Sequence, residues 1–409
     1  MIIKNILPSF ICLLILSAEA QEQRISGTII DSETKDPLPF SHVGIFNTSY
    51  GTISNIDGKF SLIIPAGYSN SKLSASYLGY EINSIDISSI NPDEVVKVSL
   101  NPTITKLPES VITLKQQSII DEAIEAIPLN HDQGKMQLRA FWRASIKNIS
   151  EQYVQMTEYA FDMFRYGEID KELNNMKILR GRVARDTSFF EDIGGLQIGV
   201  TPPSLFTSSL LKEHPILDKK IIRKHSYKIT DVTSLNGRAV YIISFKPKEK
   251  AKGKLFEGQI LLDTESLAFV KISFKKLISD ENPEKVFDTF SLASMVVGLG
   301  KSTMDKYDNE LNYQLIGDKW YLSHAKYDIN WTMRKSNNNA VRPVSFKADF
   351  VVTDIKKKNI IIPPTEEFAS TQILEKQATK NSDEYWRDYN YLLADNNFEE
   401  LFQEILDRK

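Results

Sequence analysis

Cysteine is nearly absent from this 409-residue sequence, in which Cys12 is the single example. Cys12 lies inside an N-terminal apolar run, and the Ile11 before it is not the small residue that a lipid-anchored cysteine requires. Removal of that run would leave no thiol, which excludes disulfides and cysteine-ligated metal sites from the mature chain. Secreted eukaryotic proteins of this size ordinarily hold disulfides, so the absence favours a bacterial envelope compartment.

The chain also lacks a strong excess of either charge. Fifty Lys and Arg residues stand against 53 Asp and Glu residues. This balance argues against a nucleic-acid partner, because such partners need a basic face. After the N-terminus, no segment reaches the roughly 18 consecutive apolar residues of a transmembrane helix. We therefore expect no nucleic acid among the partners and no transmembrane segment in the mature chain.

Motifs of known catalytic chemistry are missing as well. The histidines show neither the HExxH nor the HxH spacing of a zinc site, and no GxSxG elbow or Ser-x-x-Lys pair occurs. Gly298-x-Gly300-Lys301-Ser302 lacks the earlier glycine of a phosphate-binding loop, because that position is Met295. We expect no enzyme activity, no cofactor and no catalytic, cofactor-binding or metal site, and the ligand-binding residues stay unknown. We interpret the five histidines as ordinary strand or loop residues: His42, His131, His214, His225 and His324.

Residues 1–20 have the pattern of a secretory signal peptide. Lys4 supplies the positive charge, and an apolar stretch runs from Ile6 to Leu16. Ser17-Ala18-Glu19-Ala20 then provides the small residues that signal peptidase needs. We expect cleavage after Ala20, export, and a periplasmic or outer-membrane-associated location.

Between Arg24 and Asn101, short alternating runs are separated by turn residues, which is the spacing of a sandwich of antiparallel strands. This stretch resembles the carboxypeptidase-D regulatory-like (transthyretin-like) domain of Bacteroidetes envelope proteins. The resemblance implies a non-catalytic, seven-stranded β-sandwich over residues 21–103, often fused ahead of another domain. In TonB-dependent receptors it precedes a plug and a large barrel, for which this chain is too short, so we do not expect a receptor. The residues that carry the resemblance are Gly27, Asp31, Pro37-Leu38-Pro39, Val43, Gly51-Thr52, Asn55 to Phe60, Tyr77 to Tyr80 and Val98 to Leu100.

The Asp57-Gly58 pair is open to two interpretations, a calcium loop or a tight turn. An EF-hand loop needs five or more oxygen ligands within twelve residues and a terminal Glu. Here Lys59 to Leu62 resume a strand at once. We therefore interpret the pair as a hairpin turn.

A second, larger domain is predicted after a linker at residues 104–117, whose Leu107 to Ile112 could still add an edge strand. Ser118 looks like the N-cap of an amphipathic helix that Pro128 ends. Residues 118–380 then predict an α+β domain with a curved antiparallel sheet or half-barrel and a few helices, so the fold class is mainly β. The excursion at Glu191 to Pro215 should contain one short helix. The predicted strands are Met136–Lys147, Tyr153–Phe164, Lys177–Val183, Ser226–Leu235, Ala239–Pro247, Lys254–Asp263, Ala268–Lys276, Lys306–Ile316, Lys319–Trp331 and Val344–Asp354.

Turn chemistry and the C-terminus complete the organisation. Asn236-Gly237 is a type I′ hairpin signal, and Gly317-Asp318 is a second hairpin turn. Residues 381–409 carry apolar residues at helical spacing in two groups, Tyr385 to Leu393 and Phe398 to Leu406. Each group predicts a short amphipathic helix packed on the body of the protein.

Glu158 is the one acidic residue whose environment the sequence leaves open. It lies with Asp162 in an otherwise apolar and aromatic strand. If the odd positions face the core, both acids face solvent together. If the even positions face inward, Glu158 is buried and needs an arginine partner such as Arg139, Arg143 or Arg180. We favour solvent exposure or a structural ion pair over a ligand role, although burial would make Glu158 a site candidate.

These patterns leave three hypotheses for function. The first is a non-enzymatic cell-envelope binding or scaffolding protein, with an envelope protein, a glycan or a lipid as its partner. The second is a periplasmic carrier that holds a lipid or other apolar ligand in the concave sheet, because the Gly258 to Asp263 hairpin resembles half-barrel lipoprotein carriers. The third is an envelope hydrolase assembled from distant residues. The rest of the chain resembles uncharacterised Bacteroidetes secreted proteins through Arg139 to Arg143, Lys254 to Asp263 and Trp320 to Ser323. Lysine runs at Lys246 to Lys254 and Lys356 to Lys358 are interpreted as solvated charges.

Overall fold

The computed structural model describes residues 22–103, 118–132, 134–165, 175–191, 214–278, 284–285, 303–334, 341–364, 386, 388–395 and 397–408. Several predictions fall outside these residues. They are the signal peptide with its cleavage site, the 104–117 linker, most of the Glu191 to Pro215 excursion and the Gly298 to Ser302 loop.

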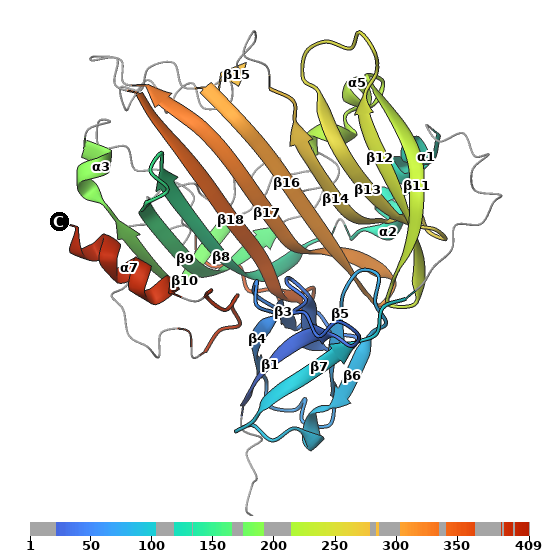
Figure 1. Ribbon diagram of the computed structural model, residues 1–409. Coiled ribbons are helices and arrows are strands. Elements are labelled where there is room, and N and C mark those ends of the chain that lie inside the picture. The colour runs from blue at the N-terminus through green and yellow to red at the C-terminus, as the bar shows by residue number, and fades with distance from the viewer. Residues whose placement is uncertain are drawn as a thin grey trace, which may run out of the picture.

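Residues 23–100 form two small sheets packed face to face (Figure 1). One sheet has the order β4-β1-β7 and the other β3-β2-β5-β6. Alternate side chains enter a shared apolar core, which includes Ile25, Ile29, Phe60 and Leu62. The seven-stranded sandwich is therefore confirmed, but its strands are not all antiparallel, because β7 pairs with β1 in parallel. Its elements are β1 (Gln23–Asp31), β2 (His42–Ile45), β3 (Gly51–Ile53), β4 (Lys59–Ile64), β5 (Lys72–Ser76), β6 (Asn83–Asp86), the 3-10 helix η1 (Ile87–Ser89) and β7 (Val95–Leu100).

The second domain is built on one large antiparallel sheet, which is twisted and does not close (Figure 1). Its order is β10-β9-β8-β18-β17-β16-β14-β13-β12-β11, and the short β15 pairs with β16. All ten strands that alternation predicts after residue 135 are present. They are β8 (Met136–Asn148), β9 (Tyr153–Arg165), β10 (Asn175–Arg185), β11 (His225–Leu235), β12 (Arg238–Pro247), β13 (Phe256–Asp263), β14 (Phe269–Lys276), β16 (Thr303–Ile316), β17 (Lys319–Arg334) and β18 (Val341–Lys356), with β15 at Glu284–Lys285.

One face of this sheet is apolar and forms the main core. Successive strand residues point to opposite faces, and the inward set includes Trp142, Tyr159, Tyr327 and Phe350, each at most 2% exposed. The same cluster takes in residues of the short helical elements. These elements are α1 (Ser118–Glu125), α2 (Ile127–Asn130), α3 (Thr187–Glu191), the 3-10 helix η4 (Pro215–Leu217) and α5 (Lys219–Ile222).

The turns follow the predicted chemistry, with one correction. Asn236 and Gly237 both have positive φ, 52° and 78°, as a type I′ hairpin requires. Gly58 also has positive φ, 72°, and its N–H donates to Asn55 O at 3.0 Å. However, the hairpin interpretation of Asp57-Gly58 is wrong, because the turn joins β3 and β4, which belong to different sheets.

Two helix predictions also need correction. Pro128 does not end the first helix, because α1 stops at Glu125 and Pro128 lies in the first turn of α2, where its missing N–H is tolerated. The C-terminal group at Phe398 to Leu406 is helical, as α7 (Phe398–Asp407). The group at Tyr385 to Leu393 is not, since residue 386 and residues 388–395 contain no helix. The next section gives the physical reason.

Candidate functional site

A single row of polar residues crosses nine strands of the large sheet on the face opposite the core. Because residues paired across neighbouring strands share a face, the ladder registers place all these side chains together; we call this the polar face. From β12 to β10 the row is Ser244, Gln259, Ser273, Glu310, Lys326, Asp349, Arg143, Glu158 and Arg182.

The C-terminal segment covers one half of this face. We define the C-terminal strap as the described residues between Trp386 and Arg408, which lie against β8, β9 and β10 (Figure 1). Trp386 and Leu392 pack with Phe141 of β8 and Val351 of β18. The apolar side of α7 packs on Met156 and Ala184, through side chains that are nearly buried: Phe398, Phe402 and Ile405.

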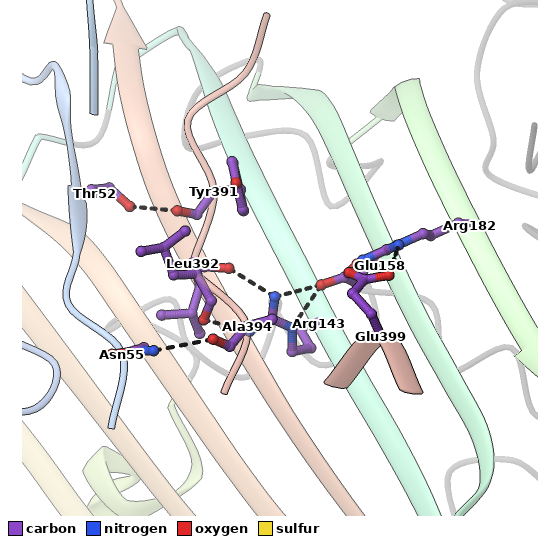
Figure 2. Close-up of polar contacts among 10 residues, drawn as sticks. Thr52, Asn55, Arg143, Glu158, Arg182, Tyr391, Leu392, Ala394 and Glu399 are labelled. Carbon is purple, nitrogen blue, oxygen red and sulfur yellow. Dashed lines mark hydrogen bonds and ion pairs between the residues drawn. The ribbon is translucent and has the colours of Figure 1, made fainter. Parts of the chain in front are cut away.

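Beneath the strap, Glu158 lies between two arginines (Figure 2). Its Oε1 accepts from Arg143 Nε at 2.7 Å, and its Oε2 accepts from Arg182 Nε at 2.6 Å. Arg182 also makes a bidentate pair with Glu399 of α7, at 2.8 and 2.6 Å. The Glu158 side chain is fully buried and that of Arg182 is 7% exposed, whereas Glu399 is 61% exposed. A buried chain of charges thus ties α7 to the sheet.

The charged side chains beneath the strap are paired with one another: Arg143 and Arg182 with Glu158, and Arg182 also with Glu399. Burial alone would lower the pKa of Arg182, but the hydrogen bonds to Glu399 and the charge of Glu158 hold that pKa above its ordinary value. The Arg143 guanidinium also has several partners. Besides Glu158, it donates to the carbonyls of Leu392 and Leu393, at 2.7 and 3.0 Å (Figure 2). A buried carboxylate held between two arginines is a structural ion-pair network, which loses stability when one partner is removed.

The structure settles which way the β9 acids face. Glu158 is buried and forms an ion pair with Arg143, one of the three expected partners. The odd residues, such as Tyr159 and Phe161, do face the core, but solvent exposure of the two acids is wrong because the strap covers their face. Asp162 is also buried, and it forms a bidentate pair with Arg139 at 2.8 and 3.0 Å. The second partner of Glu158, Arg182, was not among the expected ones. Its role depends on the β9–β10 register, in which Arg182 lies opposite Glu158.

Residues 391–394 of the strap are not helical, because both domains bind their backbone carbonyls. Thr52 Oγ1 and Asn55 Nδ2 of the sandwich donate to the carbonyls of Tyr391 and Ala394, at 3.0 and 3.1 Å (Figure 2). Arg143 donates to the carbonyls of the two residues between them, Leu392 and Leu393. In an α-helix each of these carbonyls would accept a hydrogen bond from the N–H four residues later, and would point along the helix axis instead of toward these donors. The strap therefore joins the sandwich and the sheet.

The described residues of the strap do not reach the other half of the polar face, which is hollowed. A groove of about 640 Å³ runs over β12, β13, β14, β16 and β17. Its charges are paired across strands: Glu257 with Lys275 at 2.6 Å, and Lys306 with Asp328 at 2.8 Å. Hydroxyl and amide side chains lie among them. These are Ser244, Gln259, Ser273 and Asn309.

The histidines are scattered, and within the described ranges no group of three or more His, Cys, Asp or Glu residues could hold a metal ion. His131 and His225 each accept a backbone N–H, from Phe269 at 3.2 Å and from Phe256 at 3.0 Å. Burial lowers the pKa of His131 to about 3. His42 and His324 lie at the seam between the sandwich and the sheet. Of the lysine runs, Lys246 lines the groove, and Lys248 Nζ donates to Arg223 O at 2.9 Å.

The sandwich topology and its turn residues lead to a comparison with known families. Residues 25–112 match the CarboxypepD_reg-like domain family. The N-terminal sandwich is a CarboxypepD_reg-like domain. A curated relative, "TonB-dependent receptor P3" of Formosa agariphila, is 32% identical over 100 residues, which cover 24% of this chain and 10% of that protein. The chain thus matches about a tenth of the length of that receptor.

The chain is also similar to two solved structures at low sequence identity. A putative outer membrane lipoprotein-sorting protein domain from Vibrio parahaemolyticus is 10% identical, with 59% of this chain and 93% of that chain covered and a TM-score of 0.24. A DUF1329 family protein from Desulfovibrio piger is also 10% identical, with coverages of 61% and 96% and a TM-score of 0.24. In the part of the chain that the structure describes, no helix is long and apolar enough to cross a membrane.

Proposed function

We propose that this chain is a non-enzymatic binding protein of the bacterial cell envelope that holds a polar ligand in the open groove of its large sheet. The observation that carries the proposal is the contrast on one polar face. The covered half is locked by buried ion pairs, whereas the other half forms a 640 Å³ groove. A rigid frame that leaves one concave surface free suits binding better than chemistry.

The groove lining favours a ligand rich in hydrogen-bonding groups and low in net charge. Its acidic residues are each matched by a lysine, as in Glu257–Lys275 and Asp328–Lys306. Serine hydroxyls and amides between these pairs can donate and accept hydrogen bonds. The signal-peptide pattern, the CarboxypepD_reg-like domain and the receptor relative all support an envelope location.

The rival function, a carrier of lipid or other apolar ligand, would need an apolar cavity against the sheet. The groove has charged, hydroxyl and amide walls, whereas the smaller cavity between the two domains combines polar residues with apolar and aromatic ones such as Phe40 and Leu78. On the opposite face of the sheet, Trp142, Phe161 and Phe350 are packed shut at no more than 2% exposure. The lining of the groove therefore favours the polar ligand.

The test is binding by the mature chain, beginning at Gln21, to two sets of probes. One set is an array of envelope polysaccharide fragments and peptides, and the other is a fluorescent fatty acid. Ser273 lies at the floor of the groove and its neighbours are paired, so Ser273→Trp should block the groove without breaking an ion pair. We expect at least tenfold weaker binding of a polar probe, and no change for the control Ser89→Trp in the sandwich. Saturable fatty-acid binding without any polar ligand would overturn the proposal.

A further inference from the structure

A second, smaller cavity lies at the seam between the two domains. Its volume is about 210 Å³, against roughly 10–15 Å³ for a single water. The sandwich contributes Phe40, His42 and Tyr77, and the large sheet contributes Glu310, Gln314 and His324. We call it the seam pocket. Clefts between domains are frequent ligand sites.

Three buried nitrogen atoms on the wall of the seam pocket have no hydrogen-bond partner among the described residues. They are His42 Nε2, Gln314 Nε2 and His324 Nδ1. The His324 side chain is only 2% exposed, and its other nitrogen, Nε2, lies 2.9 Å from Asp349 Oδ1. Native proteins leave few buried polar atoms unpaired. Three such atoms among the residues that line one pocket, one from the sandwich and two from the sheet, indicate that the pocket is built to be filled by something polar.

The charges around the seam pocket exclude a strongly charged occupant. Glu310 pairs with Lys271 at 2.9 Å. Burial would raise the pKa of Glu310, but Lys271, Asn312 and His324 together hold it below the usual value, so Glu310 stays an anion beside its lysine. Burial lowers the pKa of His42 to about 4, so His42 is neutral at pH 7. The charges of this pair cancel, and no three-residue metal cluster exists within the described ranges.

The unpaired nitrogen atoms also differ in what they need. The Gln314 amide nitrogen is a donor only, so it requires an acceptor. The neutral ring of His42 carries one donor and one acceptor nitrogen, so its free Nε2 can act as either. His324 Nε2 donates to the Asp349 carboxylate, so Nδ1 accepts when the ring holds one proton and donates when it holds two. A hydroxyl group both donates and accepts, and several hydroxyls on a small ring would serve all three atoms at once.

We propose that the seam pocket binds one neutral, hydroxyl-rich ring, that is, a sugar, either free or at the end of an oligosaccharide. Glu310 lines both the seam pocket and the open groove. A longer saccharide with its terminal ring in the seam pocket would therefore continue into the groove. The seam pocket does not depend on the groove, since its three unpaired atoms lie outside the groove lining.

The experiment uses the mature chain and an array of mono- to hexasaccharides, followed by calorimetric titration of the best monosaccharide. Gln314→Met keeps the shape of the side chain and removes the unpaired donor. We expect it to weaken monosaccharide binding at least tenfold while leaving the melting temperature unchanged or higher, because an unpaired buried donor is costly in the free protein. His42→Phe should behave in the same way. The matched control is Gln259→Met in the groove, which should change monosaccharide binding less than twofold.

The outcomes separate this proposal from the groove. If Ser273→Trp weakens oligosaccharide but not monosaccharide binding, the ligand runs from seam pocket to groove and the proposal stands. If the array shows no saccharide binding, the proposal is wrong whatever the groove binds. If a sugar binds but Gln314→Met and His42→Phe leave its affinity unchanged while raising the melting temperature, the seam pocket holds only water and the proposal is also wrong.

Discussion

The two halves of the polar face use the same residue types in opposite ways. In the covered half, Glu158 is fully buried, and its partners Arg143 and Arg182 have side chains only 12% and 7% exposed. In the open half, Glu257 and Lys275 occupy similar cross-strand positions, but they are 37% and 57% exposed. Both belong to one sheet with one alternation. The strap accounts for the different exposure, because it excludes water from one half and leaves the side chains of the other half solvated.

Removal of water changes what an ion pair does. An exposed pair contributes about 0–1 kcal/mol, because water already solvates both charges. A buried pair gains little net stability either, but loss of one partner leaves a charge stranded without water. Loss of one charged residue should therefore be costly in the covered half. In the open half, a ligand or water can replace the lost partner at little cost.

The largest effect should follow from breaking the ion-pair network of the covered half. Glu158→Gln would leave Arg143 without its carboxylate and Arg182 with Glu399 alone. Loss of one partner of a buried pair costs about 3–5 kcal/mol, so the free energy of unfolding should fall by that amount in urea titrations. A loss below about 1 kcal/mol would mean that the two halves do not differ energetically.

A second prediction addresses the strap itself. Phe402 is 2% exposed, and its ring lies 4.8 Å from the Arg182 guanidinium. Because truncation of a buried Phe costs about 3 kcal/mol or more, Phe402→Ala should release α7 and expose the ion-pair network to water. Amide hydrogen exchange in α7 should rise first, and that of β9 next. The control Glu404→Ala, on the outer side of α7, should leave both unchanged; faster exchange in the sandwich alone would contradict the strap model.

Sequence patterns could predict the sheet but not the ion-pair network. Alternation over most of β8 and β16–β18, and the apolar and aromatic run of β9, predict those strands. The segment from Trp386 to Leu393 has helical spacing too, yet its described residues are not helical. Thr52, Asn55 and Arg143 bind the carbonyls of residues 391–394 instead. Those donors come from distant parts of the chain, so tertiary contacts override a local pattern. The same holds for Arg182, whose partner follows only from the β9–β10 register.

The seam between the sandwich and the large sheet should respond to pH. The pKa of His42 is about 4 in the folded protein and near 6.5 when unfolded. Between these pH values His42 binds a proton in the unfolded chain but not in the folded chain. The free energy of unfolding therefore falls as the pH drops from about 6.5 to 4. At roughly 1.4 kcal/mol per pKa unit, His42 accounts for up to about 3 kcal/mol of that loss.

His42→Phe tests this contribution, because the variant has no proton to bind at that position. Urea titrations at several pH values between 7 and 4 should show a shallower decline in the variant than in the parent chain. His131 and His214, whose pKa values burial lowers to about 3, remain in both and supply a shared background decline. Parallel stability curves for the variant and the parent chain would show that water reaches His42 at the seam and that its pKa is not lowered by burial.

The smallest expected effect lies in the open half and completes the comparison. Glu257→Gln removes a carboxylate 2.6 Å from Lys275, as Glu158→Gln removes one from Arg182, but at a position where water can replace it. The free energy of unfolding should change by less than about 1 kcal/mol. The remaining contribution should vanish in about 1 M salt, where charges are screened within about 3 Å, whereas the Glu158→Gln loss should persist. Equal losses for the two variants, at either salt concentration, would show that the strap does not divide the polar face.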